Sequence, residues 1–291
     1  MTAYIDFRAI AKESLAALPG SNFYFLLDHG GLPGLFLKLS NSASKWESLF
    51  GYTRDASALP AAPILVLAGS KGQLQMSRNL FDWIAREGTY TSTVIMLSSP
   101  LRMEEMTEQL VARLNLKLSD DTEAMLRFFD PRVLESLCKT LSAEQSDKFF
   151  SAAKLWQFAD RNGKLVRVDS TFNVEDNCIF PLELSQEQEF RLLDLSEADQ
   201  VLSVLRTNVP DLAVRLPYSL QYDFVNRQIE VAKCSGLDSV LKIAIYITVQ
   251  LIAKEQFLAS ALWPRFVDRL IRSEVDFSGF FDSEAISGNV T

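Results

Sequence analysis

The stretch Met125-Leu126-Arg127-Phe128-Phe129-Asp130-Pro131-Arg132-Val133-Leu134 decides how the first half of this chain is interpreted. Its first five residues are apolar or aromatic except for Arg127, a pattern typical of a strand packed in a core. Asp130 can accept hydrogen bonds from the free N–H groups of a helix start, and Pro131 suits the first helical position. The stretch therefore predicts a buried strand that turns at once into a helix, with Arg127 and Arg132 available as ion-pair partners of Asp130.

Strand and helix signals alternate in the residues before this stretch. An apolar strand over residues 22–28 leads to a Gly30-Gly31 turn, and a helix follows over residues 32–39. Further strands are expected at residues 64–68 and 91–95, and the helix that opens after Ser99-Pro100 would place Met106, Leu110 and Leu114 on its core face. This order indicates an α/β domain with a largely central sheet.

The second half of the chain has a different pattern. A hairpin over residues 156–168 turns on Asn162-Gly163, and the polar segment Ser170–Asn177 comes next. We therefore expect residues 1–172 to form the α/β domain and residues 173–291 to form a mainly α-helical lobe. Ser185 and Gln188 have capping-box spacing, Ser196 opens another expected helix, and Trp263-Pro264 opens the last.

The most apolar segment, Val240–Ile252, contains Lys242 and Gln250 and is much shorter than the ~20 residues of a membrane span, so we expect a buried helix. The tail Phe277–Thr291 is expected to fray. Charged residues interrupt any signal-peptide core near the start of the chain, and Cys138, Cys178 and Cys234 lack metal or redox spacing. Both observations favour a cytosolic protein with reduced thiols.

The charge balance is acidic. The net charge is −8, and the segment Glu175–Asp199 holds eight acidic residues against a single basic one, Arg191. Nucleic-acid binding depends on basic charge that neutralises phosphates, and an anionic membrane surface attracts basic segments. The composition therefore disfavours both kinds of partner.

The sequence shows no evident set of catalytic residues. The single histidine, His29, follows a strand but has no nucleophile elbow to serve, and the glycine-rich segment Gly30–Gly34 lacks the ending of a phosphate loop. The acid pairs Glu104-Glu105 and Asp120-Asp121 are adjacent in sequence and point in different directions or lie in a turn. A hydrolase or transferase that uses His29 or paired carboxylates stays as the alternative to a protein-binding function. We expect no metal, no cofactor and no catalytic residue.

Several motifs share an order that resembles one family. The stretch around Asp130 resembles the Phe-(Tyr/Phe)-Asp-Pro-Arg signature of the effector adaptor chaperones of bacterial type VI secretion. The likeness covers most of the first ~165 residues, a span that suits one domain. Its other elements are Phe23–Asp28, Ala62–Leu67, Leu80–Ile84, Leu97–Ser99, Met103–Leu114, Leu141–Gln145, Phe149-Phe150 and Trp156. The chain departs from the pattern at Asp120–Glu123, where a glycine is usual, and at Phe129, where tyrosine is common.

The resemblance implies a function that composition alone does not. Such proteins act in the bacterial cytoplasm, are not themselves secreted, bind one toxic effector and help to load it onto the VgrG spike protein. The resemblance implies a protein-binding or structural role for six residues, called the signature below: Arg127, Phe128, Phe129, Asp130, Pro131 and Arg132. It also implies that the helical lobe helps to select the effector. A purely structural subunit of the secretion apparatus is a second alternative.

Overall fold

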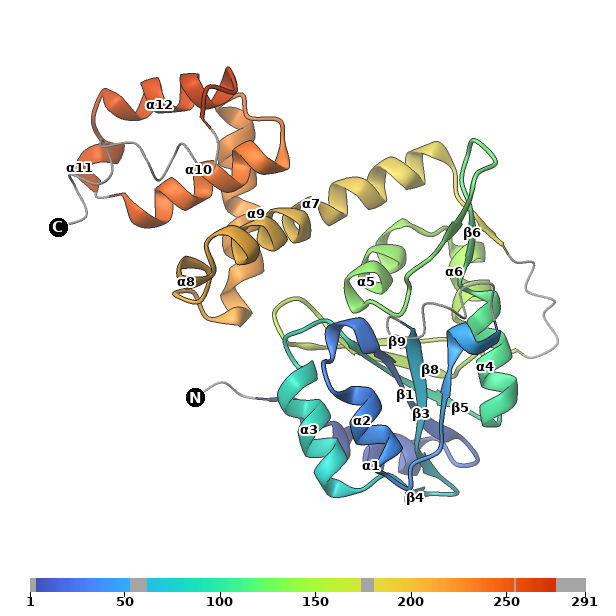
Figure 1. Cartoon of the computed structure of the whole chain (residues 1–291). Coiled ribbons are helices and arrows are strands. Elements are labelled where there is room, and N and C mark those ends of the chain that lie inside the picture. Colours follow the sequence, from blue (N-terminus) through green and yellow to red (C-terminus); the bar gives the residue numbers. More distant parts are fainter. Residues whose placement is uncertain (1–3, 53–61, 174–180, 254, 276–291) are drawn as a thin grey trace. The chain divides into compact units, whose positions relative to one another are not determined.

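The computed structural model describes residues 4–52, 62–173, 181–253 and 255–275, and these fall into two compact units, Met1–Asp194 and Leu195–Thr291 (Figure 1). The division lies later than the boundary we expected at residues 172/173. The reason is strand β10 (Leu182–Glu183), which pairs in parallel with β6 (Asn115–Lys117) and buries Leu182 and Leu184 in the core of the first unit. Helix α7 (Gln186–Asn208) contains the point of division.

A large antiparallel sheet forms the centre of the first unit. Its strand order is β2-β3-β1-β5-β8-β9, with the short strand β4 paired to β3. The strands are β1 (Asn22–Asp28), β2 (Trp46–Ser48), β3 (Pro63–Ser70), β4 (Gln73–Leu74), β5 (Val94–Ser99), β8 (Leu155–Ala159) and β9 (Leu165–Asp169). The expected α/β domain with a central sheet is confirmed.

Strand β1 shows why this sheet is central. Its side chains alternate between two separate cores: Tyr24 and Leu26 enter one, and Phe23, Phe25 and Leu27 enter the other. A strand covered on both faces is a nearly continuous apolar run rather than an alternating one. Helices α1 (Phe7–Ala17), α2 (Leu35–Ser40) and α3 (Arg78–Gly88) supply the second core, and helices α4 (Met103–Ala112), α5 (Pro131–Thr140) and α6 (Ala143–Phe150) supply the first.

The signature is buried, but it is not a strand. Strand β7 (Glu123–Met125) pairs with β6 and ends before it, and the amide of Asp130 then donates to the carbonyl of Arg127 at 3.0 Å to close a turn. The prediction of a strand that extends through Phe129 is therefore wrong. The apolar pattern correctly indicated that these residues are buried, but it did not require an extended backbone. Helix α5 does begin at Pro131, as predicted.

The sequence also predicted a hairpin and a helix after the first strand in this unit. The hairpin of β8 and β9 is confirmed, and Gly163 in its turn has a φ of 77°, a conformation that glycine adopts without strain. The helix expected over residues 32–39 is shorter: a 3₁₀ turn, η1 (His29–Gly31), precedes α2. A second 3₁₀ segment, η2 (Leu49–Tyr52), follows β2.

The second unit is helical in all its described elements. After α7 come α8 (Pro210–Ala213), α9 (Tyr218–Cys234), α10 (Val240–Ile252), α11 (Glu255–Leu258) and α12 (Leu262–Ile271). Helix α10 has the predicted bounds and buries the run from Ile243 to Val249. Ser196 lies inside α7 and starts no helix. Within the described ranges, no helix has both the length and the apolar character to cross a membrane, and the tail from Phe277 lies outside them.

Candidate functional site

The start of helix α5 is fixed by the aspartate of the signature. The carboxylate of Asp130 accepts a hydrogen bond from the backbone N–H of Arg132 at 2.9 Å, so Asp130 is the N-cap that its sequence position predicted. The guanidinium of Arg132 folds back on the same carboxylate, with Nε at 3.0 Å from Oδ1 and Nη2 at 2.7 Å from Oδ2. One buried carboxylate thus caps the helix and holds an arginine in a two-pronged ion pair.

Arg127 has a different partner from the one its sequence neighbours suggested. Its Nη2 lies 3.2 Å from Oδ2 of Asp28, at the end of β1, and its guanidinium carbon lies 5.4 Å from the centre of the Phe129 ring. Oδ1 of Asp28 accepts from the N–H of Gly30 at 3.0 Å. Arg127 therefore joins the signature to the end of the central strand.

Burial raises the pKa of Asp28 above its ordinary value. The positive charge of Arg127 acts in the opposite direction, and the nearby negative charge of Asp130 adds to the rise. Because its side chain is only 7% exposed, Asp28 carries its charge at a cost that Arg127 offsets in part.

A second ion-pair group holds the other side of α5. Glu135 pairs with Arg161, which lies in the turn between β8 and β9, and with Lys139 on its own helix. Nη2 of Arg161 also donates to the carbonyl of Arg132 at 3.3 Å. The signature is thus connected to the hairpin turn as well as to β1.

The signature residues differ in how far their side chains are exposed to a partner protein. Phe128, Phe129, Asp130 and Pro131 are buried. The Phe128 ring packs edge-on against Phe149 with the centroids 5.6 Å apart. Arg127 keeps 58% of its side chain exposed and Arg132 keeps 37%. Of the six predicted site residues, the two arginines are therefore the ones whose side chains a partner protein can touch.

The residues of the alternative enzymatic hypothesis lie in separate places. His29 stacks on Phe36 with the ring centroids 6.3 Å apart, and its Nδ1 is buried without a hydrogen-bond partner among the described residues. Glu104 pairs with Lys45, and Glu105 pairs with Arg102 at the start of α4. These contacts bring no second titratable group to His29.

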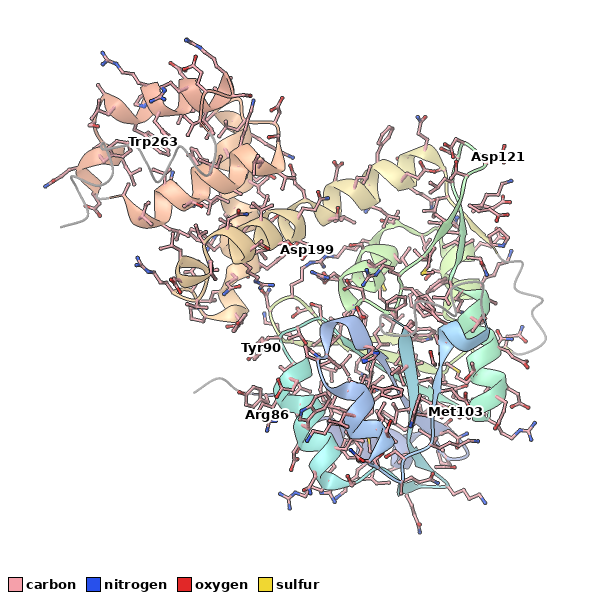
Figure 2. The ribbon with its side chains drawn as sticks, in the orientation of Figure 1. Arg86, Tyr90, Met103, Asp121, Asp199 and Trp263 are labelled. Atoms are coloured by element: carbon pink, nitrogen blue, oxygen red, sulfur yellow. The ribbon has the colours of Figure 1, made fainter. Side chains whose placement is uncertain are left out.

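The acidic turn before β7 also has local partners. Asp120 accepts from the N–H of Thr122 at 3.0 Å, and Asp121 pairs with Lys117 at 2.7 Å (its place at the tip of the hairpin is labelled in Figure 2). In the described part of the chain, no group of three or more His, Cys, Asp or Glu side chains is arranged to hold a metal ion. Cys138 and Cys234 are free thiols, and Cys178 lies outside the described residues.

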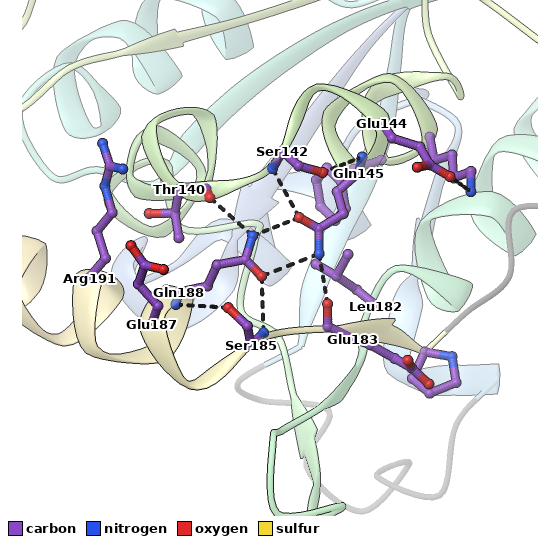
Figure 3. A pocket seen from close by; sticks show the side chains of 13 residues that line it. Thr140, Ser142, Glu144, Gln145, Leu182, Glu183, Ser185, Glu187, Gln188 and Arg191 are labelled. Carbon is purple, nitrogen blue, oxygen red and sulfur yellow. Dashed lines mark hydrogen bonds and ion pairs between the residues drawn. The ribbon is translucent and has the colours of Figure 1, made fainter.

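The last residue of α5, Thr140, lines a pocket of about 730 Å³ (Figure 3). The other walls come from α6 and the residue before it, from β10 with Pro181 before it, and from the start of α7. Two side-chain amides hold these elements together: Nε2 of Gln188 donates to Oε1 of Gln145 at 2.6 Å, and Nε2 of Gln145 donates to the carbonyl of Glu183 at 2.8 Å. The pocket is therefore a built feature of the first unit, below called the α6–α7 pocket.

Each of these glutamines also closes a capping box. Oε1 of Gln145 accepts from the N–H of Ser142 at 2.9 Å, and Oε1 of Gln188 accepts from the N–H of Ser185 at 3.0 Å. The box at Ser185 was predicted from its spacing. The contact between the two glutamines was missed, because capping boxes report local chemistry and give no sign that two helix starts meet.

Comparisons with known proteins identify one region of the chain. Residues 23–148, which run from β1 through the signature into α6, match a family model described as "Domain of unknown function (DUF4123)". The match spans less than half of the chain. Neither a search of curated proteins nor a search of solved structures returned a significant match.

Proposed function

We propose that this chain is an adaptor chaperone that binds a type VI secretion effector in the bacterial cytoplasm and helps to load it onto the VgrG spike. The observation that carries the proposal is the match of residues 23–148 to the DUF4123 model, a family associated with effector adaptors of this secretion system. The matched region contains the whole signature, and its contacts with Asp28 lie within the same region.

The surface of the first unit supports a protein-binding function. Arg127 and Arg132 present their charges beside a rigid aromatic core, and a partly buried arginine next to aromatic residues is a frequent anchor in protein interfaces. Exposed apolar side chains also occur on helix α2, where Phe36 is 54% and Leu37 is 66% exposed. On this proposal the chain acts without catalysis and without a cofactor.

The second unit would take part in choosing the effector. Its helix α9 leaves Leu220 and Val231 about half exposed, while Val225 and Ile229 on the opposite side enter the core. Residues 11 apart on a helix lie on one face, so these two side chains share a surface. An apolar surface of this kind suits a partner of matching shape.

The test is co-purification from cells with the toxin encoded by the neighbouring gene and with the spike protein. The full chain should retain both, and the toxin should be more resistant to proteolysis in its presence, because binding stabilises the bound state. Retention of neither protein would refute the adaptor function. A chain that stays in the assembled secretion machine would instead be a structural subunit.

The enzymatic alternative has its own test. A hydrolase that depends on His29 would lose its activity in a His29→Ala variant. The adaptor proposal expects this variant to retain the toxin as the unchanged protein does, since the imidazole ring of His29 stacks on Phe36, a neighbour within the first unit.

A further inference from the structure

The α6–α7 pocket contains a buried hydroxyl group that its own helix does not satisfy. The Thr140 side chain is only 7% exposed, and its Oγ1 has no hydrogen-bond partner among the described residues. Elsewhere in the chain, the hydroxyls of Thr248 and Ser136 donate to the carbonyl four residues earlier, at 2.8 and 2.9 Å. A buried polar group without a partner lowers stability and therefore calls for an explanation.

Two charged side chains of α7 line the same pocket as this hydroxyl. In Figure 3 the Thr140 side chain is on the side of the pocket where Glu187 and Arg191 stand, one turn apart on α7. Both α7 side chains are exposed, and neither has a hydrogen bond or ion pair within the described part of the chain. A carboxylate, a guanidinium and a hydroxyl, each without a side-chain partner among the described residues, therefore line the same pocket.

The other charges of the pocket are engaged or balanced. Glu144 pairs with Lys148 at 2.7 Å, and Glu183 lies 3.8 Å from Lys117. Because acids and bases in the lining nearly cancel, the pocket attracts neither a phosphate-like anion nor a strongly cationic ligand. The buried side chains of Phe149 and Leu182 add an apolar part to the lining.

An amide group fits this arrangement best. It donates and accepts at once, so that its N–H can meet the carboxylate of Glu187 while its C=O meets Arg191 or Thr140. An extended polypeptide presents such amides in series.

We propose that the α6–α7 pocket binds an extended segment of the effector, with one of its amide groups held between Thr140, Glu187 and Arg191. This inference rests on the proposed adaptor function and adds to it a site in the first unit. On binding, the hydroxyl of Thr140 gains the hydrogen-bond partner that it lacks.

Thr140→Val tests the inference with a matched control. Valine keeps the shape of threonine and removes the hydroxyl, so its effect on binding isolates the hydrogen bond. Thr107, on α4, is also a buried threonine whose Oγ1 lacks a partner, and it is not among the residues that line the pocket. Both Thr140→Val and Thr107→Val should keep or raise the melting temperature, because each removes an unsatisfied buried group.

Binding should separate the two variants. With an inactive form of the neighbouring toxin titrated against the full chain, Thr140→Val should weaken the affinity about tenfold, the loss of one hydrogen bond to a charged or amide partner. Thr107→Val should bind as the unchanged protein does. Glu187→Gln and Arg191→Gln should weaken binding to a similar extent, whereas Arg167→Gln, an exposed arginine on β9, should not.

The outcomes separate this inference from the proposed function. If the unchanged chain binds the toxin and Thr140→Val and Arg191→Gln bind it equally well, the pocket is not the site and the adaptor function stands. An equal loss in Thr140→Val and Thr107→Val would also overturn the inference, since the effect would then follow from altered packing. If the unchanged chain binds no toxin, both proposals fail together.

Discussion

The side chains of Arg127 and Asp28 meet at 3.2 Å although the two residues lie 99 positions apart in the chain. The contact joins the end of the central strand β1 to the signature, and Asp130 stands close enough to influence the same carboxylate. The signature is therefore one part of a charged network that extends from Asp28 through α5 to Arg161 in the hairpin turn. Its members fix the position of Arg127 and Arg132 at the surface.

The N-cap should make a measurable contribution to stability. Asp130→Ala removes the acceptor of the Arg132 N–H together with both prongs of its ion pair. We expect the free energy of unfolding to fall by about 1–2 kcal/mol. Urea denaturation measures the change, and Asp130→Asn, which retains a capping oxygen, should lose less. An unchanged melting temperature in the alanine variant would contradict the capping assignment.

Asp28 should make the free energy of unfolding vary with pH in the acidic range. Its pKa in the folded chain is raised by burial, so the folded state holds the proton more tightly than the unfolded state. The contribution of this carboxyl group to the free energy of unfolding is therefore fully present below its pKa in the unfolded chain, near 3.8. The contribution is lost as the pH rises through the pKa of the folded chain. The charge of Arg127 lowers the pKa of Asp28 in the folded chain. Arg127→Gln should therefore raise this pKa further, and the loss of stability should extend to higher pH.

Two measurements check the Asp28 prediction. The carboxyl carbon of Asp28, followed by NMR, should titrate at higher pH in Arg127→Gln than in the unchanged chain. Urea denaturation over the acidic range should show the corresponding shift in stability. Asp28→Asn serves as the control because it removes the titrating group, so Arg127→Gln should not alter the pH dependence in its background. A titration that moves to lower pH would show that Arg127 is not the main compensating charge.

The sequence predicted local chemistry well and long-range contacts poorly. The capping role of Asp130 and the helix start at Pro131 follow from groups within two residues of each other, so a local pattern reveals them. The strand expected through Phe129 was wrong, because a buried turn and a buried strand have the same apolar composition. No local signal pairs Arg127 with Asp28 or Gln145 with Gln188, since these contacts exist only after the sheet and the helices have assembled.

Arg113 should be among the most sensitive polar positions of the first unit. It is fully buried, and its guanidinium donates to the carbonyls of Phe149 at 2.7 Å and Gln109 at 2.7 Å and to the hydroxyl of Ser151 at 3.2 Å. Arg113→Met should reduce the free energy of unfolding by on the order of 3 kcal/mol, because buried acceptors at the end of α6 lose their donors. A loss below about 1 kcal/mol would show that the end of α6 needs no such donor.

The glutamine contact should hold the start of α7. Gln188→Ala removes the reciprocal cap at Ser185 and the hydrogen bonds to Gln145 and to the carbonyl of Thr140. We expect faster hydrogen exchange of the first α7 amides and a loss of about 1 kcal/mol. Gln200→Ala, on the same helix, is the matched control, since the hydrogen bond that it removes, to Ser196, lies within α7 itself. Equal exchange in both variants would mean that the cap does not anchor the helix.

The last prediction concerns the exposed apolar surface of α9. Leu220→Glu combined with Val231→Glu places two charges on one helix face whose side chains are now 54% and 48% exposed. Because these residues lie at the surface, the free energy of unfolding should change by less than about 0.5 kcal/mol per substitution. If the second unit selects the effector, toxin binding should fall while binding of the VgrG spike persists, and pull-downs with each partner separate the two results. Leu262→Glu, an equally exposed leucine on α12, is the control. Undiminished toxin binding by the double variant would show that this face of α9 has no selecting role, and equal loss of both partners would point to a general effect on the chain.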